Sequence, residues 1–323
     1  MEGEGTEVTV KTPSRLHFAM INLRSDLGRL YGSVGVAIDR PNIVLEARPA
    51  DTLTVEGPSA DRARNYAETI LKGYGVDGGA DIKMISDIKA HLGFGSGTQL
   101  ALAVGTALSE LYGLDLKLEE MAMRLHRSRR SGIGTYAFER GGFIVDGGHK
   151  PDRSNSVPPL VFRSDVPEDW LFVIGLPDIS QDRSGKVEND IFKRMEPPPG
   201  SLIGDISRIV LVQMIPAILE RDIEAFGSAM TDIDFKFGEF WLKIQGGRFS
   251  HPVIEEGVDF LLETGAYGVG QSSWGPAFYG LVEGKAQGDE IASKLGEFLN
   301  RDNRRGEAFV AKPDNQGAVV TIT

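Results

Sequence analysis

The chain has 323 residues, of which 41% are hydrophobic and 25% charged, enough apolar material for one large or two ordinary folded domains. Its net charge of −11 argues against a protein that mainly neutralises nucleic-acid phosphates or anionic lipids. It contains no cysteine, which excludes disulfides, thiolate catalysis and cysteine-ligated metal centres.

The N-terminus and the hydropathy pattern indicate in which cellular compartment the protein is expected. The first ten residues are acidic and lack the basic and apolar regions of a signal peptide. No uncharged apolar run approaches the ~18–20 residues that a membrane span requires. We therefore expect a soluble, cytoplasmic protein that binds neither nucleic acid nor membrane.

The first half of the chain alternates between strand and helix patterns. Period-two alternation and short apolar runs predict strands over residues 6–11, 43–47, 53–55, 80–86 and 142–145. Apolar residues at helical spacing predict helices over 62–74, 98–111 and 118–127. Arg62 falls on the first of these helices, an ordinary one, so we expect Arg62→Ala to cost far less activity than Arg15→Ala.

The second half begins after a polar, proline-bearing stretch at 149–159, which is typical of a linker. Strands are expected over 170–176, 267–270, 277–282, 307–311 and 318–322, and helices over 203–219, 222–230, 253–262 and 287–300. Because the elements interleave without a strict βαβ repeat, they favour an α+β fold of two lobes. We place the domain boundary between 1–160 and 161–323.

A glycine-rich loop at 91–99 carries the strongest chemical signal. Gly93, Gly95 and Gly97 let backbone approach a ligand closely, and the helix that follows offers unpaired N–H groups to phosphate. The side chains of Ser96, Thr98 and Gln99 add donors or a cap. The spacing matches neither a Walker loop nor a dinucleotide fingerprint. The alternative is an ordinary strand–helix connection capped by Ser96 or Thr98.

Arg15 and His17 lie two residues apart on an extended segment, so they are predicted to point to the same side. Together they suit the clamping of an anion and the transfer of a proton. A surface arginine beside a structural histidine is the alternative.

Two further segments are candidates for the same site. Residues 124–135 concentrate arginines, including Arg129 and Arg130, beside a flexible Ser-Gly-Ile-Gly turn. Such a run suits a carboxylate or phosphate, although it is also typical of a solvated helix face. Residues 268–276 supply Gln271, Ser272 and Trp274, which would line a second wall or simply link two strands.

In this order the segments resemble the GHMP small-molecule kinase superfamily. Pro13-Ser-Arg15, the loop at 93–98 and the loop at 268–275 are similar to its three motifs. The resemblance implies a two-lobed α+β fold, with a ribosomal protein S5 domain 2-like N-terminal lobe and an α/β C-terminal lobe. Gly97 replaces a second serine of the phosphate loop, and no aspartate lies in 131–138, where many members place a catalytic carboxylate. These departures argue against ATP-dependent phosphoryl transfer.

Longer strings are similar to one branch, the beta-ribofuranosylaminobenzene 5'-phosphate synthase family of archaeal methanopterin biosynthesis. They span 14–18, 93–99, 129–142 and 270–276. The resemblance implies condensation of phosphoribosyl diphosphate with 4-hydroxybenzoate or 4-aminobenzoate, release of diphosphate and carbon dioxide, Mg²⁺ as cofactor, and a homodimer. An ATP-dependent kinase and a non-catalytic binding or regulatory relative remain the alternatives.

That reaction assigns roles to the candidates. The loop at 93–99 would hold diphosphate, and Arg15, Arg129 or Arg130 would hold the aromatic carboxylate. His17 is the first candidate for the base and His91 the second. Trp274, Phe94 and Tyr136 would form an aromatic wall. Glu188 and Asp190 are the candidates for metal ligands, with solvated loop acids as the alternative.

Overall fold

The computed structural model describes residues 6–153, 156–179, 190 and 194–323, whose strands form three sheets. The first sheet has the order β13-β1-β4-β6-β5, with bounds Val319–Ile322, Val8–Lys11, Val44–Ala50, Gly79–Ser86 and Thr54–Glu56. The second has the order β2-β3-β7-β8, with bounds Ser14–Asn22, Tyr31–Ile38, Phe143–Asp146 and Leu160–Ser164. The third has the order β10-β11-β9-β12, with bounds Gly268–Gln271, Phe278–Glu283, Trp170–Pro177 and Gly306–Ala311. Together with the helices, they confirm the α+β class.

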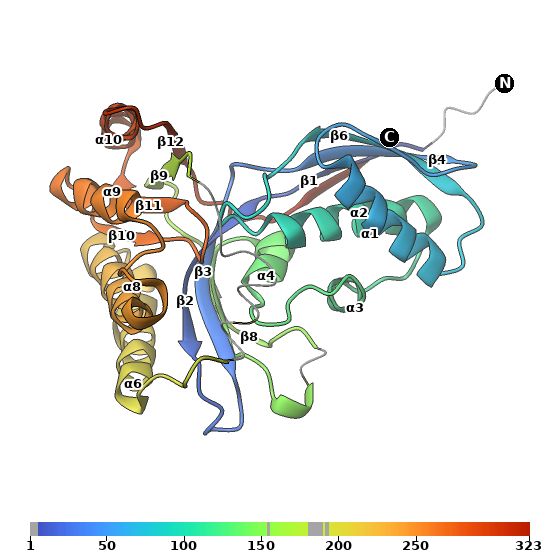
Figure 1. Ribbon diagram of the computed structural model, residues 1–323. Helices are drawn as coiled ribbons and strands as arrows, with labels where there is room; N and C mark the ends of the chain where they lie inside the picture. Colours follow the sequence, from blue (N-terminus) through green and yellow to red (C-terminus); the bar gives the residue numbers. More distant parts are fainter. Residues whose placement is uncertain (1–5, 154–155, 180–189, 191–193) are drawn as a thin grey trace.

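Helices cover the sheets of both lobes (Figure 1). In the first lobe, α2 packs on β1 and β4, α1 packs on α2, and α4 packs on β2 and β3. In the second lobe, α8 packs on β10, whereas α9 and α10 pack against β11 and β12. The bounds of the helices are α1 Ala60–Gly73, α2 Ser96–Tyr112, α3 Leu118–Arg124, α4 Ile133–Arg140, α6 Gly200–Ile209, α7 Ile215–Glu220, α8 Ile223–Gln245, α9 Pro252–Glu263 and α10 Lys285–Leu299.

Strand β2 joins the two lobes. Its Phe18 is buried and contacts three aromatic rings of the second lobe, those of Phe172, Phe226 and Tyr279, at centroid distances of 5.4 to 6.5 Å. Burial of such rings removes a large apolar area from water, which is the main force that holds the lobes together. The site described below forms on this strand.

Strand pairing crosses residue 160, where we placed the domain boundary. Strand β8 pairs with β7 of the first lobe, and β13, near the C-terminus, pairs with β1. The division at residue 160 stays a prediction, but the polar stretch before it does not separate two independent sheets.

The clearest difference from the expected elements is the length of α8. The apolar pattern predicted a helix over 222–230, but the helix continues to Gln245. The extension contains Gly238 and several aromatic residues, all weaker helix formers than alanine, and tertiary packing overrides their propensity. This unpredicted half of α8 carries part of the functional site.

One stretch of the described residues, Gly200–Glu220, is long and apolar enough to cross a membrane by length and composition alone. It contains Asp205 and Arg208, so it is not an uncharged run. It packs through α6 and α7 against α8, and only 28% of its most apolar window is buried. One such helix is weak evidence for a membrane protein.

Candidate functional site

The glycine-rich loop opens directly onto a helix, as predicted. Gly95 precedes α2, and no described side chain caps the helix start, so its first N–H groups point out of the helix end. Arg15 on β2 donates from its guanidinium to the carbonyl oxygen of Gly93, and its backbone N–H donates to the carbonyl of Phe94 over 3.2 Å. The loop is therefore fixed to β2 on the side from which Arg15 projects.

The C-terminal loop closes against the glycine loop. A Cβ on Gly275 would lie 2.2 Å from the backbone nitrogen of Gly93, so only glycine permits this approach. The Ser272 hydroxyl donates to the Gly93 carbonyl over 2.7 Å and accepts from the His17 N–H over 3.0 Å. Three segments distant in sequence thus meet at one point.

A cavity of about 420 Å³ lies over this loop, and we call it the arginine pocket. Its guanidinium groups come from three elements: Arg15 from β2, Arg62 from α1 and Arg127 from the loop after α3. The remaining lining consists of Tyr66, Ala90, His91, Gly93–Thr98, Ser273, Trp274 and Gly275. Among these described residues there is no carboxylate, so the pocket suits a polyanion such as a diphosphate.

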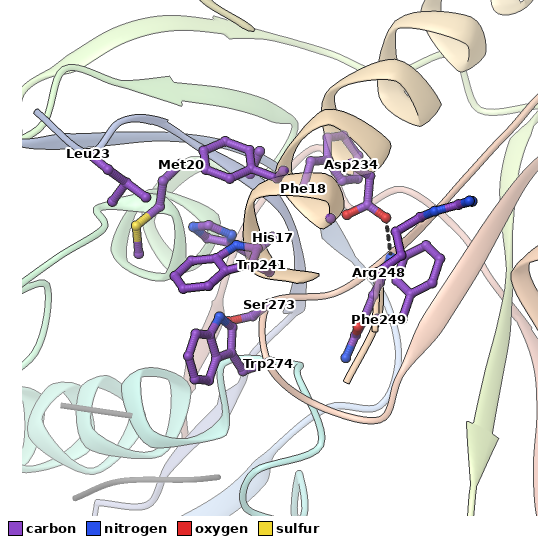
Figure 2. Close-up of a pocket in the computed structure, with 14 residues that line it drawn as sticks. His17, Phe18, Met20, Leu23, Asp234, Trp241, Arg248, Phe249, Ser273 and Trp274 are labelled. Carbon is purple, nitrogen blue, oxygen red and sulfur yellow. Dashed lines mark hydrogen bonds between the residues drawn. The ribbon is translucent and has the colours of Figure 1, made fainter. Parts of the chain in front are cut away.

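A second, smaller cavity of about 70 Å³ lies between β2 and α8, and we call it the aromatic pocket (Figure 2). It is lined by His17, Phe18, Ala19, Met20, Leu23, Asp234, Phe237, Gly238, Trp241, Arg248, Phe249, Gln271, Ser273 and Trp274. Ser273 and Trp274 line both cavities, so the two pockets adjoin. A flat apolar ring in this pocket would therefore lie next to an anion in the arginine pocket.

Two titratable side chains of the aromatic pocket are uncharged at neutral pH. Burial, followed by the charge of Arg15, lowers the pKa of His17 to about 3. Burial raises the pKa of Asp234 to about 8, even though its Oδ2 accepts from the Gln271 N–H over 2.9 Å and Arg248 lies nearby. Neutral imidazole and neutral carboxylic acid are thus the resting forms.

The structure brings most of the predicted residues to this site. Arg15, His91 and the loop residues Gly93–Thr98 line the arginine pocket, together with Trp274. His17 and Gln271 line the aromatic pocket instead, so Arg15 and His17 serve adjoining cavities. Their roles toward a substrate stay predictions.

Other predicted residues are engaged within the fold. The Gln99 amide donates to the Gly134 carbonyl over 2.8 Å, and the Gln271 amide donates to the Gly275 carbonyl over 2.6 Å. The Tyr136 hydroxyl donates to the Pro158 carbonyl over 2.6 Å. These contacts position the loops of the site and leave the anion to other groups.

The arginine cluster contributes a different residue from those predicted. Arg127 lines the arginine pocket, whereas Arg129 is exposed and lines neither pocket. Arg130 lies close enough to His17 to lower its pKa. Arg62, which we placed on an ordinary helix and expected to matter less than Arg15, also lines the pocket, and its guanidinium lies 3.4 Å from the Ser96 hydroxyl.

Asp234 and Trp241 were missed by reasoning from sequence. Both lie on the part of α8 beyond residue 230, where no helix was expected. The spacing of Asp234, Phe237, Gly238 and Trp241 at three- and four-residue intervals places them on one helix face, and this was the signal available.

The predicted metal ligands receive no support. Glu188 lies outside the described residues. Asp190 is described, but the described residues contain no group of three or more histidines and acids that would hold a metal ion. The pocket lining, likewise, holds guanidinium groups where a metal site would need oxygen ligands.

Comparison with known families defines the class of protein. Residues 61–142 match the GHMP kinases N terminal domain, and residues 214–301 match the GHMP kinases C terminal domain. The fold is similar to a homoserine kinase from Cytophaga hutchinsonii, with a TM-score of 0.70 at 15% identity over 99% of each chain. It is also similar to the Methanococcus jannaschii mevalonate kinase, with a TM-score of 0.63 at 16% identity over 98% of this chain and all of the other.

Full-length relatives narrow this class. The chain is 35% identical to the beta-ribofuranosylphenol 5'-phosphate synthase of Methanothermobacter thermautotrophicus, over 97% of this chain and 98% of the relative. It is 32% identical to the synthase of the same name from Archaeoglobus fulgidus, over 97% and 99% of the two chains. The chain belongs to the beta-ribofuranosylphenol 5'-phosphate synthase family, a transferase branch of the GHMP kinase superfamily.

Proposed function

We propose that this enzyme joins 5-phosphoribosyl 1-diphosphate to 4-hydroxybenzoate in methanopterin biosynthesis, with release of diphosphate and carbon dioxide. The name of the relatives supports the proposal, because it describes a phenol that carries a ribofuranosyl 5'-phosphate group. The phenol in that name favours 4-hydroxybenzoate over 4-aminobenzoate as the acceptor.

The observation that carries the proposal is the junction of the two pockets. A carboxylate-free cavity lined by Arg15, Arg62 and Arg127 adjoins an aromatic cavity, and Ser273 and Trp274 line both. A diphosphate in the first pocket and a benzoate ring in the second would place C1 of the ribose beside the ring carbon that attacks it. Such positioning replaces a bimolecular encounter with a preorganised one.

The arginine pocket would stabilise the departing diphosphate. As the bond from C1 to the diphosphate oxygen breaks, negative charge grows on the leaving group. The three arginines line this cavity, and the N–H groups at the start of α2 open onto the same loop. Preorganised donors of this kind lower the barrier because they need not reorient during the reaction.

We still propose Mg²⁺ as the cofactor, but we assign it no ligands from the protein. The described lining of the arginine pocket offers arginines and no carboxylate, which does not fit a protein-bound Mg²⁺. We therefore derive no step through the ion.

The kinase alternative is disfavoured by the 131–138 segment. A Cβ at Gly134 would lie 3.2 Å from the Cβ of Thr98, so a carboxylate at this position would crowd the start of α2. Residues 131–138 also contain no aspartate or glutamate, so the acid that many GHMP kinases place there is missing.

One experiment separates the candidate functions. The purified protein is incubated with phosphoribosyl diphosphate, Mg²⁺ and either benzoate, and diphosphate and carbon dioxide are measured together. Equal amounts of the two products support the proposal, and a faster rate with 4-hydroxybenzoate supports the phenol acceptor. ATP consumption with a small alcohol would support the kinase, and no turnover in any assay would support a non-catalytic relative.

The homodimer and the cytoplasmic location also remain predictions. Light scattering of the purified protein tests the first. Fractionation of the source cells tests the second.

A further inference from the structure

Asp234 occupies the end of the aromatic pocket that lies away from the arginine pocket. In Figure 2, Ser273 and Trp274, which belong to both cavities, lie toward the bottom, and Asp234 lies above and to the right of them, across from His17 and Trp241. A carboxyl group buried in a cavity lined largely by aromatic and aliphatic side chains is costly unless it is neutral or paired. Its position therefore calls for a function.

The geometry of the acceptor makes that function specific. In 4-hydroxybenzoate the hydroxyl and the carboxylate lie at opposite ends of the ring. If the carbon that bears the carboxylate faces the ribose at the Ser273–Trp274 junction, the hydroxyl points to the far end of the pocket. Asp234 is the carboxyl group in the described lining of this pocket, and it lies at that end.

Resting on the function proposed above, we propose that Asp234 is the catalytic base that takes the proton of the acceptor hydroxyl as the carbon–carbon bond forms. The ring carbon attacks C1 of the ribose with an electron pair, and the bond from C1 to diphosphate breaks with its pair on the leaving group. The hydroxyl proton passes to the ionised form of Asp234, which is the minor form at neutral pH and grows as pH rises toward 8, and a ring ketone is left. The bond to the carboxylate then breaks, carbon dioxide leaves, and the electron pair restores the aromatic ring. The phenolate oxygen recovers its proton from Asp234, so no proton is gained or lost overall.

The other titratable groups in and around the aromatic pocket are compatible with this role. From β2 comes His17, whose pKa of about 3 makes it a weak proton acceptor at neutral pH. From β11 comes the buried Tyr279, whose pKa is raised well above its ordinary value by burial and by Asp234. Arg248 lies nearby, yet its guanidinium is placed 4.5 Å over the ring of Phe235.

The proton affinity of Asp234 supports the assignment over His17. With its pKa raised to about 8, Asp234 titrates near physiological pH, where a general base is most effective. The Gln271 N–H bonds Oδ2 and holds the carboxyl in place.

The test uses an isosteric substitution and two acceptors. Asp234→Asn keeps an oxygen for the Gln271 N–H but accepts no proton, and Asp232→Asn, at an exposed position on the same helix, is the matched control. Wild type and both variants are assayed with 4-hydroxybenzoate and with 3,5-difluoro-4-hydroxybenzoate, whose hydroxyl is already ionised at neutral pH. Binding of each acceptor is measured by calorimetry.

We expect Asp234→Asn to lower kcat with 4-hydroxybenzoate by about 100-fold or more, with acceptor affinity changed less than threefold. The ratio of wild-type to variant rates should fall at least tenfold with the fluorinated acceptor, because no proton then needs to be removed. We expect the wild-type rate to rise with pH as Asp234 ionises, and the Asp234→Asn rate not to show this rise. A variant rate within threefold of wild type with 4-hydroxybenzoate, or an equal loss with both acceptors, overturns the assignment. If wild type itself converts neither acceptor, the proposed function fails first.

Discussion

The rings of Trp241 and Trp274 meet edge to face, with centroids 5.0 Å apart and planes 87° apart. Trp241 belongs to α8 and Trp274 to the C-terminal loop, so this pair closes the aromatic pocket between two distant segments. The cavity beside it, about 70 Å³, is roughly half of the ~150 Å³ that holds a benzene ring in an engineered cavity. Entry of an aromatic acceptor therefore requires side chains of this lining to move.

Removal of the Trp274 side chain should open the junction between the pockets. We expect Trp274→Ala to raise KM for the acceptor about tenfold or more and to release diphosphate without an equal amount of carbon dioxide, because water reaches C1 of the ribose. Parallel measurement of the two products checks this. Leu242→Ala, at an exposed position beside Trp241, should keep the products equal. Equal products in Trp274→Ala would contradict this role.

The three arginines of the arginine pocket should each affect binding of the phosphorylated substrate. A hydrogen bond to a charged group contributes about 1.5–3 kcal/mol, so we expect Arg15→Ala, Arg62→Ala and Arg127→Ala to raise KM for phosphoribosyl diphosphate roughly 10- to 150-fold. The matched control is Arg64→Ala on the same helix as Arg62, because Arg64 donates to the Leu53 carbonyl and does not line the pocket. Steady-state kinetics measure the effect, and a near-wild-type KM in Arg62→Ala would remove this residue from the site.

Gly275 lies so close to Gly93 that we expect the protein not to tolerate a side-chain methyl group at position 275. A Cβ would lie 2.2 Å from a backbone atom, so we expect Gly275→Ala to lower the free energy of unfolding by about 1–3 kcal/mol and to reduce turnover. A Cβ added at Gly204 in α6 would meet no atom within 4 Å, so Gly204→Ala should leave the free energy of unfolding unchanged or raise it by about 0.5–1 kcal/mol. Urea denaturation of both variants tests the contrast. Equal stabilities of the two variants would show that the loops can move apart.

Asp234 should make stability depend on pH in a defined direction. Its pKa is raised from 3.8 to about 8 in the folded state, so between these values the folded protein holds a proton that the unfolded chain has lost. Stability contributed by the neutral acid is complete below pH 4 and is lost as pH rises to 8, by at most about 1.4 kcal/mol per pH unit. We therefore expect Asp234→Asn to melt above wild type at pH 7–8 and close to it at pH 4.

Thermal melts across this pH range measure the difference. Asp232→Asn should follow wild type throughout. A constant difference between Asp234→Asn and wild type at every pH would show that the carboxyl does not titrate in this window.

Several elements of the first lobe and the glycine loop that opens onto α2 could be predicted from local patterns, whereas β3 and α4 were not. The glycines at 93–97 and the apolar spacing of the next helix depend on neighbouring residues, and Arg15 lies on a strand next to that loop. Prediction was weakest where tertiary packing decides which side chains line the site. Local patterns favoured Arg129 over Arg62, which lies on an ordinary helix, yet the fold places Arg62 and not Arg129 in the pocket.

The sequence by itself determined the family, the absence of thiol chemistry and the glycine loop that opens a helix, because each is written in residue types and short spacings. The tertiary structure decided which side chains meet. It brought Ser272 to Gly93 across 179 residues, and it turned the continuation of α8 toward β2 so that Asp234, Trp241 and His17 share a cavity. The pKa values of Asp234 and His17 belong to the same category, because burial by distant segments sets them and no local pattern encodes that burial.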